Sequence, residues 1–459
     1  MPDTAEELIV HDEDGALTPE FVRSVSAALA DDDQKIARKL TRDLHAADLA
    51  DLIEQLRRSE RVDLIDKLGR TFDVESLPEL DEGVRDELMD ALPNQVIASA
   101  VRKLETDDAL YLIEDMDEAD QEEILAKVPR ADRVALKRAL DYPEDTAGRI
   151  MQTEFVAVPM FWSVGQTIDY MRDEEDLPEN FSEIYVIDPV YHTVGYIPVS
   201  HILRNSRDIA IADIMIDHQN IFNVTDDQAD VAYRFEQYNL VSAAVVDDDN
   251  RLVGSITIDD IVDVIQEEAE EDILRLGGVG DEEITGSILA TTRSRIVWLV
   301  INLATAILAS WIISLFDATI EEMVALAILM PIVASMGGNA GTQTMTVAVR
   351  AIATRDLGPV NALRVITRES SVGLINGILF AGIMGLFAWW WFGSDQLGLV
   401  IGAAMIINMI AAALAGILIP LGLDHFNIDP AIASGVFVTT VTDVVGFFAF
   451  LGLAALWLI

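Results

Sequence analysis

Five stretches of this 459-residue chain are apolar for long enough to cross a lipid bilayer, and they restrict its fold more than any other feature. A membrane-spanning helix needs ~20 predominantly apolar residues, because its backbone polar groups must be paired inside the hydrocarbon layer. All five stretches lie in the C-terminal part of the chain. We therefore predict an all-α membrane domain over residues 296–459, with spans at about 296–316, 322–350, 371–392, 397–423 and 430–459.

Charge divides the chain in the same way. The net charge is −47, and residues from 296 onward hold only nine acidic and four basic side chains. The acidic remainder suits either a surface adapted to high salt or a surface that binds cations, and bulk charge does not separate the two. It excludes nucleic acid as a partner, because no basic patch is present to neutralise phosphates. The absence of Cys excludes disulfides, thiolate metal sites and Cys nucleophiles.

The basic residues of the membrane domain indicate its orientation. They lie before the first span and around the connection between the second and third, whereas the connections after the first and third spans have none. The positive-inside bias then predicts a plasma-membrane protein with a cytoplasmic N-terminal part and the C-terminus outside. The first ten residues have neither a basic nor an apolar region, so we expect no signal peptide.

One carboxylate, Asp443, lies inside the fifth span. A charge at bilayer depth costs roughly 2.5 kcal/mol or more unless it is paired or hydrated. Thr439, Thr440 and Gly446 lie one turn away and leave room for water or an ion, and no Lys, Arg or His partner lies in the interior of a span. The simplest counter-charge is a mobile cation; the alternative is a protonated or hydrogen-bonded Asp that fixes a helix contact.

The second span carries a polar stripe along one helical face. Its members recur at i, i+4, i+7 and i+11, with Gln343 beside them: Ser335, Asn339, Thr342 and Thr346. Gly337, Gly338 and Gly341 allow close helix approach. The alternative is that the glycines only pack and the hydroxyls bond back to their own helix. Oxygen ligands without His or Cys suit Mg²⁺, Ca²⁺ or Mn²⁺, and a single carboxylate acting through water favours Mg²⁺.

Residues 147–265 contain an internal repeat in which Met151 corresponds to Met215 and Gly195 to Gly254, with about five extra residues near LPENF in the first copy. Each copy is expected to read helix, strand, helix, strand, strand, helix. The repeat resembles a tandem pair of CBS (cystathionine-β-synthase-type) domains, which are regulatory and often bind adenine nucleotides. A Gly…Thr-x-x-Asp ending is present only in the second copy, where it implies a weak nucleotide site at Gly254 and Thr257 and leaves ATP binding open.

The remaining soluble segments show helical periodicity. Residues 1–145 predict short amphipathic helices in a small superhelix, without a catalytic constellation, so we do not expect an enzyme. Residues 259–278 predict one connecting helix with an apolar line (Ile261, Ile265, Ala269 and Ile273) beside an acidic stripe (Asp260, Asp263, Glu267 and Glu271). A solvated face is the plain reading of that stripe. Bound divalent ions would relieve the repulsion between its carboxylates.

The predicted order is a helical domain (1–145), the CBS pair (146–210 and 211–258), an acidic connecting helix (259–295) and the five-span domain (296–459). With the motifs PIVASMGGNAGTQT, DPAIASGVFVTTVTDVVGF and EEAEEDILRLGG, this order resembles the MgtE family of magnesium channels and transporters over nearly the whole chain.

The resemblance implies a homodimer in the lipid membrane with its pore at the subunit interface. Asp443 would hold hydrated Mg²⁺ there, and Gly338, Asn339 and Thr439 would line the path. It also implies a cytosolic sensor whose carboxylates close the pore when Mg²⁺ binds: Asp107, Asp108, Asp227, Asp260, Asp263, Glu268, Glu271 and Asp272. This sequence departs from the family pattern at Tyr111, Ala229, Asn239 and His201.

We therefore predict a Mg²⁺-selective channel or transporter for uptake, closed by cytosolic Mg²⁺, with Mn²⁺, Co²⁺ or Ca²⁺ as surrogate ions. Two alternatives remain open from the residues. One is an ion-coupled exchanger on the same scaffold. The other is a membrane-anchored CBS sensor that transports nothing, although the polar stripe of the second span argues against a mere anchor.

Overall fold

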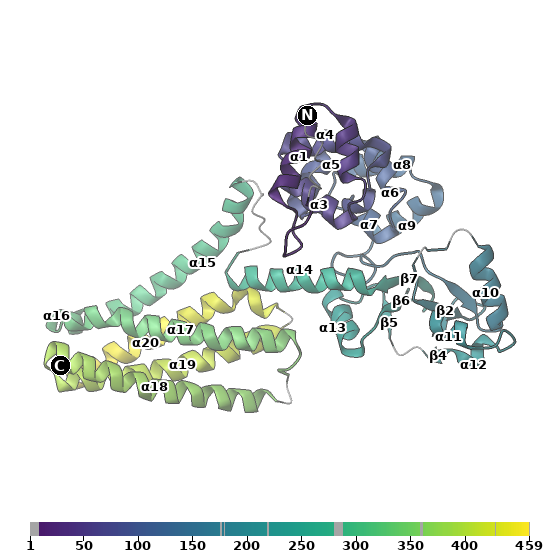
Figure 1. Cartoon of the computed structure of the whole chain (residues 1–459). Coiled ribbons are helices and arrows are strands. Elements are labelled where there is room, and N and C mark those ends of the chain that lie inside the picture. Colours follow the sequence, from purple (N-terminus) through teal and green to yellow (C-terminus); the bar gives the residue numbers. More distant parts are fainter. Residues whose placement is uncertain are drawn as a thin grey trace. The chain divides into compact units, whose positions relative to one another are not determined.

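The computed structural model describes residues 9–174, 177–178, 180–217, 220–279, 288–358, 361–426 and 428–458 (Figure 1). They form two compact units, one ending at Gln266 and one beginning at Glu267. Most of the segment in which we expect no signal peptide, and part of LPENF, lie outside the described residues.

The first unit begins with a helical domain, as its periodicity predicts. Apolar side chains such as Phe21, Leu52 and Leu88 form one continuous core. Capping residues define the helix starts: Thr18 accepts a hydrogen bond from the Phe21 amide, and Asp33 accepts from two amides of the next helix. The helices are α1 (Pro19–Ala30), α2 (Gln34–Thr41), α3 (Ala46–Gln55), α4 (Arg58–Leu68), α5 (Glu82–Ala91), α6 (Asn94–Val101), α7 (Thr106–Tyr111), α8 (Glu118–Lys127) and α9 (Arg130–Leu140), with 3-10 turns η1 (Gly69–Thr71) and η2 (Val74–Ser76).

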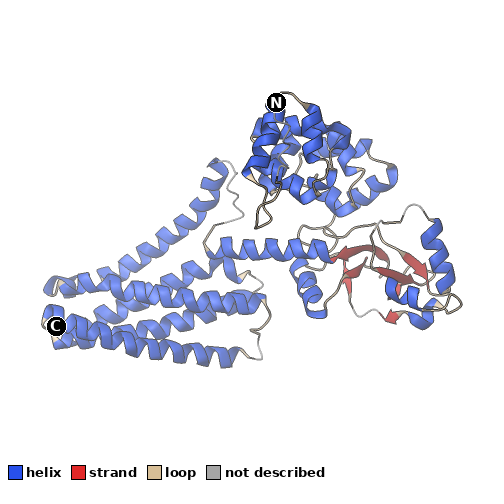
Figure 2. Cartoon of the chain, in the orientation of Figure 1, coloured by secondary structure: helices blue, strands red, loops and turns tan. Residues whose placement is uncertain are grey.

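The CBS pair follows, and the strands of the described residues are confined to it (Figure 2). The first sheet has the order β1 (Ala157–Pro159), β2 (Glu183–Ile187), β3 (Thr193–Pro198), β4 (Ile216–Asp217); the second has β5 (Ile221–Asn223), β6 (Ser242–Val246), β7 (Leu252–Thr257). In each copy the first two strands are parallel and the next pair is antiparallel. The associated helices are α10 (Val164–Asp173), α11 (Val199–Arg204), α12 (Ile211–Ile214) and α13 (Gln228–Tyr238).

The two copies complete each other's sheets, and this corrects one prediction. Strand β4, at the start of the second copy, pairs with β3 of the first, and Gln152, at the start of the first copy, bridges to Ser255 of the second. The repeated glycines allow this exchange. A Cβ on Gly195 would lie 2.7 Å from the Ile216 carbonyl oxygen, and one on Gly254 would lie 2.5 Å from Met151 Sδ. The helix expected at the start of the first copy was wrong: residues 147–152 form turns and that bridge instead.

The second unit contains the end of α14 (Ile258–Leu276) and the membrane domain. Among the residues that the structure describes, five helices are long and apolar enough to cross a membrane, which confirms the predicted number of spans. They are α15 (Ile288–Ser314), α17 (Ala325–Ala353), α18 (Ala362–Phe392), α19 (Asp395–His425) and α20 (Pro430–Trp457). The segment after α15, expected as a loop, forms the short helix α16 (Asp317–Glu322).

Glycines set the close packing of the bundle. Gly373 and Gly377 of α18 meet the backbone of α19 at Met409 and Ile406, where a Cβ would lie 2.8 Å and 3.0 Å from the nearest backbone atoms. Helix α19 is the most buried of the five spans and packs against α17, α18 and α20. Helix α15 packs mainly against α20 and diverges from the other helices towards its N-terminal end (Figure 1). The centre of the bundle therefore lies along α19.

Candidate functional site

Asp443 of α20 is half-buried, and no ion pair to it occurs within the described residues. Its neighbours supply oxygen atoms. The hydroxyls of Thr439, Thr440 and Thr442 donate to carbonyl oxygens of their own helix, at 2.7–2.9 Å. A hydroxyl that donates in this way keeps its lone pairs, so exposed Thr439, one turn from Asp443, can still accept a hydrogen bond or face a cation.

The predicted stripe on α17 lies on the outer surface of the unit. Its four members are all exposed: Ser335, Asn339, Thr342 and Thr346. Asn339 Nδ2 donates to Ser335 Oγ at 3.4 Å, and Thr346 Oγ1 donates to the Thr342 carbonyl at 3.0 Å. Part of the alternative reading, in which hydroxyls bond their own helix, is thus correct. Nevertheless the four side chains remain exposed, and the space beside Gly338 is open.

Helices α17 and α20 cross next to these polar residues. A Cβ on Gly341 would lie 2.5 Å from Val438 of α20, so only glycine allows the two helices to approach so closely. Gly341 follows Asn339 by two positions, and Val438 precedes Thr439. The crossing therefore brings the oxygen-rich segments of the two helices to one region. The predicted use of glycine for close approach is confirmed for Gly337 and Gly341 and was wrong for Gly338, beside which nothing lies within 4 Å.

A polar residue that the sequence reasoning did not select lies inside the same bundle. Asn408 of α19 is 1% exposed, and its Nδ2 donates to the Val333 carbonyl of α17 at 2.8 Å. Its Oδ1 has no hydrogen-bond partner within the described residues. The available signal was simple, since Asn408 is the only polar side chain between Leu397 and Leu423.

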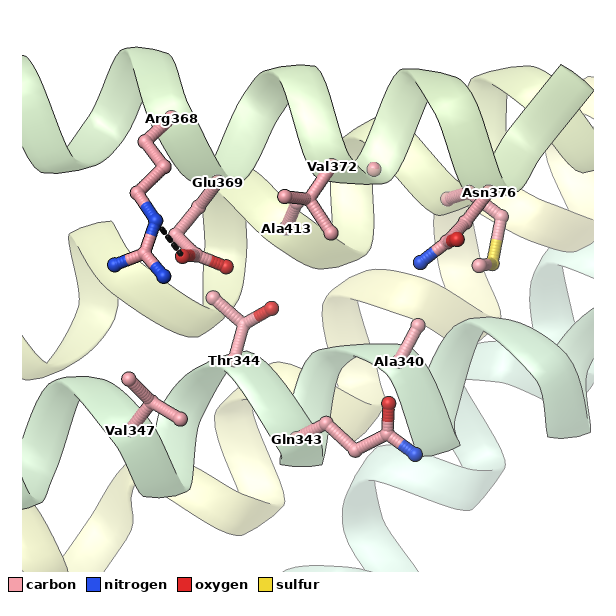
Figure 3. A pocket seen from close by; sticks show the side chains of 11 residues that line it. Ala340, Gln343, Thr344, Val347, Arg368, Glu369, Val372, Asn376 and Ala413 are labelled. Carbon is pink, nitrogen blue, oxygen red and sulfur yellow. Dashed lines mark ion pairs between the residues drawn. The ribbon is translucent and has the colours of Figure 1, made fainter.

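A pocket of about 280 Å³ lies between α17, α18 and α19 (Figure 3). Gln343 and Thr344 line it from α17, and Glu369 and Asn376 from α18. The Glu369 carboxylate lies 3.9 Å from the Arg368 guanidinium, so charges of both signs border the pocket. Gln343 thus belongs to the wall facing α18, beside the stripe rather than within it.

In the first unit, carboxylates of α7 face the start of α14. Asp107 and Asp108 are close enough to Asp260 for its charge to raise the pKa of each of them. Two further carboxylates of the helical domain belong to this acidic cluster, and the sequence reasoning missed them. Burial raises the pKa of both, and nearby charges add to it: those of Glu154 and Asp260 for Glu105, and that of Asp263 for Glu79. Their positions in the sequence gave no signal, because the fold alone brings the two segments together.

The cluster crowds negative charge that is partly removed from water. Burial, together with the neighbouring Asp260 and other carboxylates, raises the pKa of Asp108 to about 7. Burial and the charge of Glu154 raise the pKa of Glu105 to about 7. Burial is also the main cause that raises the pKa of Asp260, to about 6. Carboxylates in this state favour a proton or a metal ion over an unpaired charge.

Local contacts give Asp260 and Gly254 structural roles of their own. The Thr257 amide and hydroxyl donate to Asp260 Oδ2, at 3.3 Å and 2.6 Å, where α14 begins. The Thr-x-x-Asp ending thus caps the connecting helix, and Gly254 makes room for Met151. These contacts account for the motif without a nucleotide, and no contact described here tests the predicted nucleotide site.

Two other predicted positions also have local explanations. Asp227 caps α13 by accepting from the Ala229 amide at 3.0 Å, and no described contact joins it to the acidic cluster. Tyr111, at a position where a carboxylate was expected, lies under the buried Arg85 guanidinium, 3.7 Å from its ring centre.

The second half of α14 contacts α17 and α20 within the second unit. Arg275 pairs with Glu271 and, at 2.6 Å, with Asp429, which caps α20. Burial and the charges of Asp429 and Glu268 raise the pKa of Asp272. Leu276 packs against Met345 of α17 and Val438 of α20. The end of the connecting helix is thus attached directly to α17 and α20.

The carboxylates of the acidic cluster fit divalent cations by donor type, because hard cations such as Mg²⁺ and Ca²⁺ prefer carboxylate oxygens. Within the described residues, however, no three His, Asp or Glu side chains are already arranged as a metal site. Binding would therefore require the carboxylates to move together.

Comparison with known proteins gives matches along most of the chain. Family models match residues 330–453 (MgtE, divalent cation transporter), 44–145 (MgtE intracellular N domain) and 211–267 (CBS domain). The magnesium transporter MgtE of Thermus thermophilus is 30% identical over 95% of this chain and 98% of its own length. That of Enterococcus faecalis is 35% identical over 70% and 71%. A solved cytosolic domain of the Mg²⁺ channel MgtE in complex with ATP is 26% identical and covers 53% of this chain and 99% of its own, with a TM-score of 0.49.

Proposed function

The chain belongs to the MgtE family of divalent cation transporters, and from this premise we propose that it carries Mg²⁺ into the cell and is closed by cytosolic Mg²⁺. The ion path is assigned to α17 and α20. The observation that carries the proposal is Asp443, a carboxylate inside a membrane-spanning helix without an ion-pair partner among the described residues, beside an exposed stripe of oxygen atoms.

The stripe itself supports a homodimer. Exposed Asn, Ser and Thr side chains at bilayer depth are unfavourable against lipid, so they require a watery path or a protein partner. Two copies that face each other through α17 and α20 supply both. Asp443, Asn339, Gly338 and Thr439 would then line a pore in which Mg²⁺ keeps most of its water. The CBS and helical domains would lie in the cytoplasm and the C-terminus outside.

The acidic cluster supports the proposed closure by Mg²⁺. Without a cation, Asp107, Asp108 and Asp260 repel one another across the contact between the helical domain and α14. Mg²⁺ binds best where these carboxylates are together, and this differential affinity shifts the population towards the packed state. Three further sensor residues, Glu268, Glu271 and Asp272, lie on the half of α14 that contacts α17 and α20. Ion binding along α14 would therefore act on the pore helices directly.

The test is Mg²⁺ influx into proteoliposomes that contain the full chain, followed with a fluorescent Mg²⁺ indicator. We expect Asp443→Ala to abolish influx, while Asp395→Asn, which removes an exposed charge at the start of α19, leaves influx unchanged. Influx by Asp443→Ala at the rate of the parent would refute the pore assignment. Absence of influx in every variant, the parent included, would favour the sensor that transports nothing.

The same assay addresses the exchanger alternative. Influx that depends on a counter-gradient of Na⁺ or H⁺ would replace the channel by coupled exchange on this scaffold. Competition with Mn²⁺, Co²⁺ and Ca²⁺ measures how far these ions substitute for Mg²⁺. Calorimetry with ATP tests the predicted nucleotide site, and loss of binding in Thr257→Ala would assign it to the second CBS copy.

A further inference from the structure

Asn408 is a polar residue with an incomplete set of hydrogen bonds at the centre of the membrane bundle. Its Nδ2 donates to the Val333 carbonyl at 2.8 Å, while its Oδ1 is without a partner among the described residues. A buried oxygen without a donor is unfavourable, and a leucine of similar shape would fill the same space without that cost. Packing alone therefore does not account for an asparagine at this position.

The side chain lies where three helices meet. A Cβ on Gly337 of α17 would come within 2.2 Å of Asn408 Nδ2, and a Cβ on Gly446 of α20 within 2.7 Å. Both glycines are thus required for the amide to fit between the helices. Asn408 also binds the α17 backbone at Val333, so its position is fixed by contacts on both sides.

The contact of Asn408 with α17 and α20 lies next to the residues assigned to the ion path. Gly446 follows Asp443 by one helical turn on α20. On α17, Ser335 lies between Val333 and Gly337 in the sequence, and Asn339 follows Gly337 by two residues. We propose that Asn408 is a positioning residue, which holds the polar stripe of α17 at a fixed distance from Asp443 and so sets the ion selectivity of the path. This inference rests on the proposed transport function.

The test compares Asn408→Leu with the parent in proteoliposomes, by measuring Mg²⁺ and Na⁺ influx separately. Leucine fills the space, removes the unpartnered oxygen and cannot donate to Val333. We expect the variant to be at least as heat-stable as the parent, because no polar atom is left unpaired. We expect its ratio of Mg²⁺ to Na⁺ influx to fall about tenfold, the order expected for one lost hydrogen bond. An unchanged ratio in the folded variant would overturn the proposal.

A second pair of variants covers the case in which the leucine protein does not fold. Gly337→Ala pushes a methyl group against Asn408, whereas Gly382→Ala adds one to α18 where nothing lies within 4 Å. The first should lower the ratio and the second should not; equal ratios in both would contradict the positioning role. A parent protein without Mg²⁺ influx would instead refute the proposed function, and the role of Asn408 with it.

Discussion

The acidic cluster between α7 and α14 makes a prediction about pH that can be worked out from Asp108. Burial and neighbouring carboxylates raise the pKa of Asp108 from 3.8 to about 7. The folded state therefore binds this proton more tightly than the unfolded state. The stability that this proton contributes is fully present below pH 3.8, is lost as the pH rises from there to about 7, and changes no further above that pH. A difference of about three pKa units corresponds to ~4 kcal/mol as an upper limit, since relaxation and shared protons reduce it.

The perturbation is Asp108→Asn, which resembles the protonated acid at every pH. Hydrogen exchange of the full chain in Mg²⁺-free buffer reports the local opening of α7 and of the start of α14. At pH 8 the variant should exchange at least about tenfold more slowly than the parent, equivalent to ~1.4 kcal/mol, because the repulsion is absent. At pH 5 the folded parent is protonated but its open state is not, so only about one of the three pKa units has been lost and the difference between the two proteins should be much smaller than at pH 8.

Mg²⁺ provides the second arm of the experiment. At pH 8, added Mg²⁺ should slow exchange in the parent more than in Asp108→Asn, because the ion neutralises the charge that the variant lacks. Asp90→Asn, which changes an exposed carboxylate of α5, is the matched control and should follow the parent. The reasoning fails if the ratio of parent to Asp108→Asn exchange is the same at pH 5 and pH 8, or if the variant opens faster at pH 8.

Three further predictions concern packing and the connecting helix. Arg275→Ala removes a partly exposed ion pair, so hydrogen exchange at the end of α14 should quicken by less than about tenfold. Gly416→Ala places a methyl group 2.7 Å from a carbonyl oxygen of α17 and should lower the stability of the bundle by about 1–3 kcal/mol. The size-exclusion peak of this variant should therefore disappear at a lower temperature on heating. Gly422→Ala, where the added methyl group meets open space, should behave like the parent. Gly254→Ala should lower the melting temperature of the CBS pair, because the added methyl group would lie 2.5 Å from the Met151 sulfur. Adding Met151→Ala to the same chain should restore part of the lost melting temperature.

Periodic features of this chain could be predicted from its sequence because each depends on one element at a time. The spans follow from the length of apolar segments, and the stripe on α17 follows from the helical repeat. The helix wrongly expected at residues 147–152 shows the limit of this reasoning. Those residues were compared with residues 211–214, which do form α12, but Gln152 bridges to the strand of the other copy instead. A contact between copies decided the local structure, and no local pattern contains it.

The candidate site residues also divide into those that the sequence alone reveals and those that only contacts between elements reveal. Asp443 could be found because a carboxylate in an apolar span is conspicuous, and Asn408 could have been found for the same reason. Glu105 and Glu79 could not, because an acidic residue is ordinary in a segment with so many of them. They become distinctive only in the fold, where burial, together with the charges of Asp260 and Asp263 on α14, raises their pKa values. In a chain with a net charge of −47, acidic residues alone therefore do not mark a candidate cation site. A better mark is a group of carboxylates that the fold buries close together.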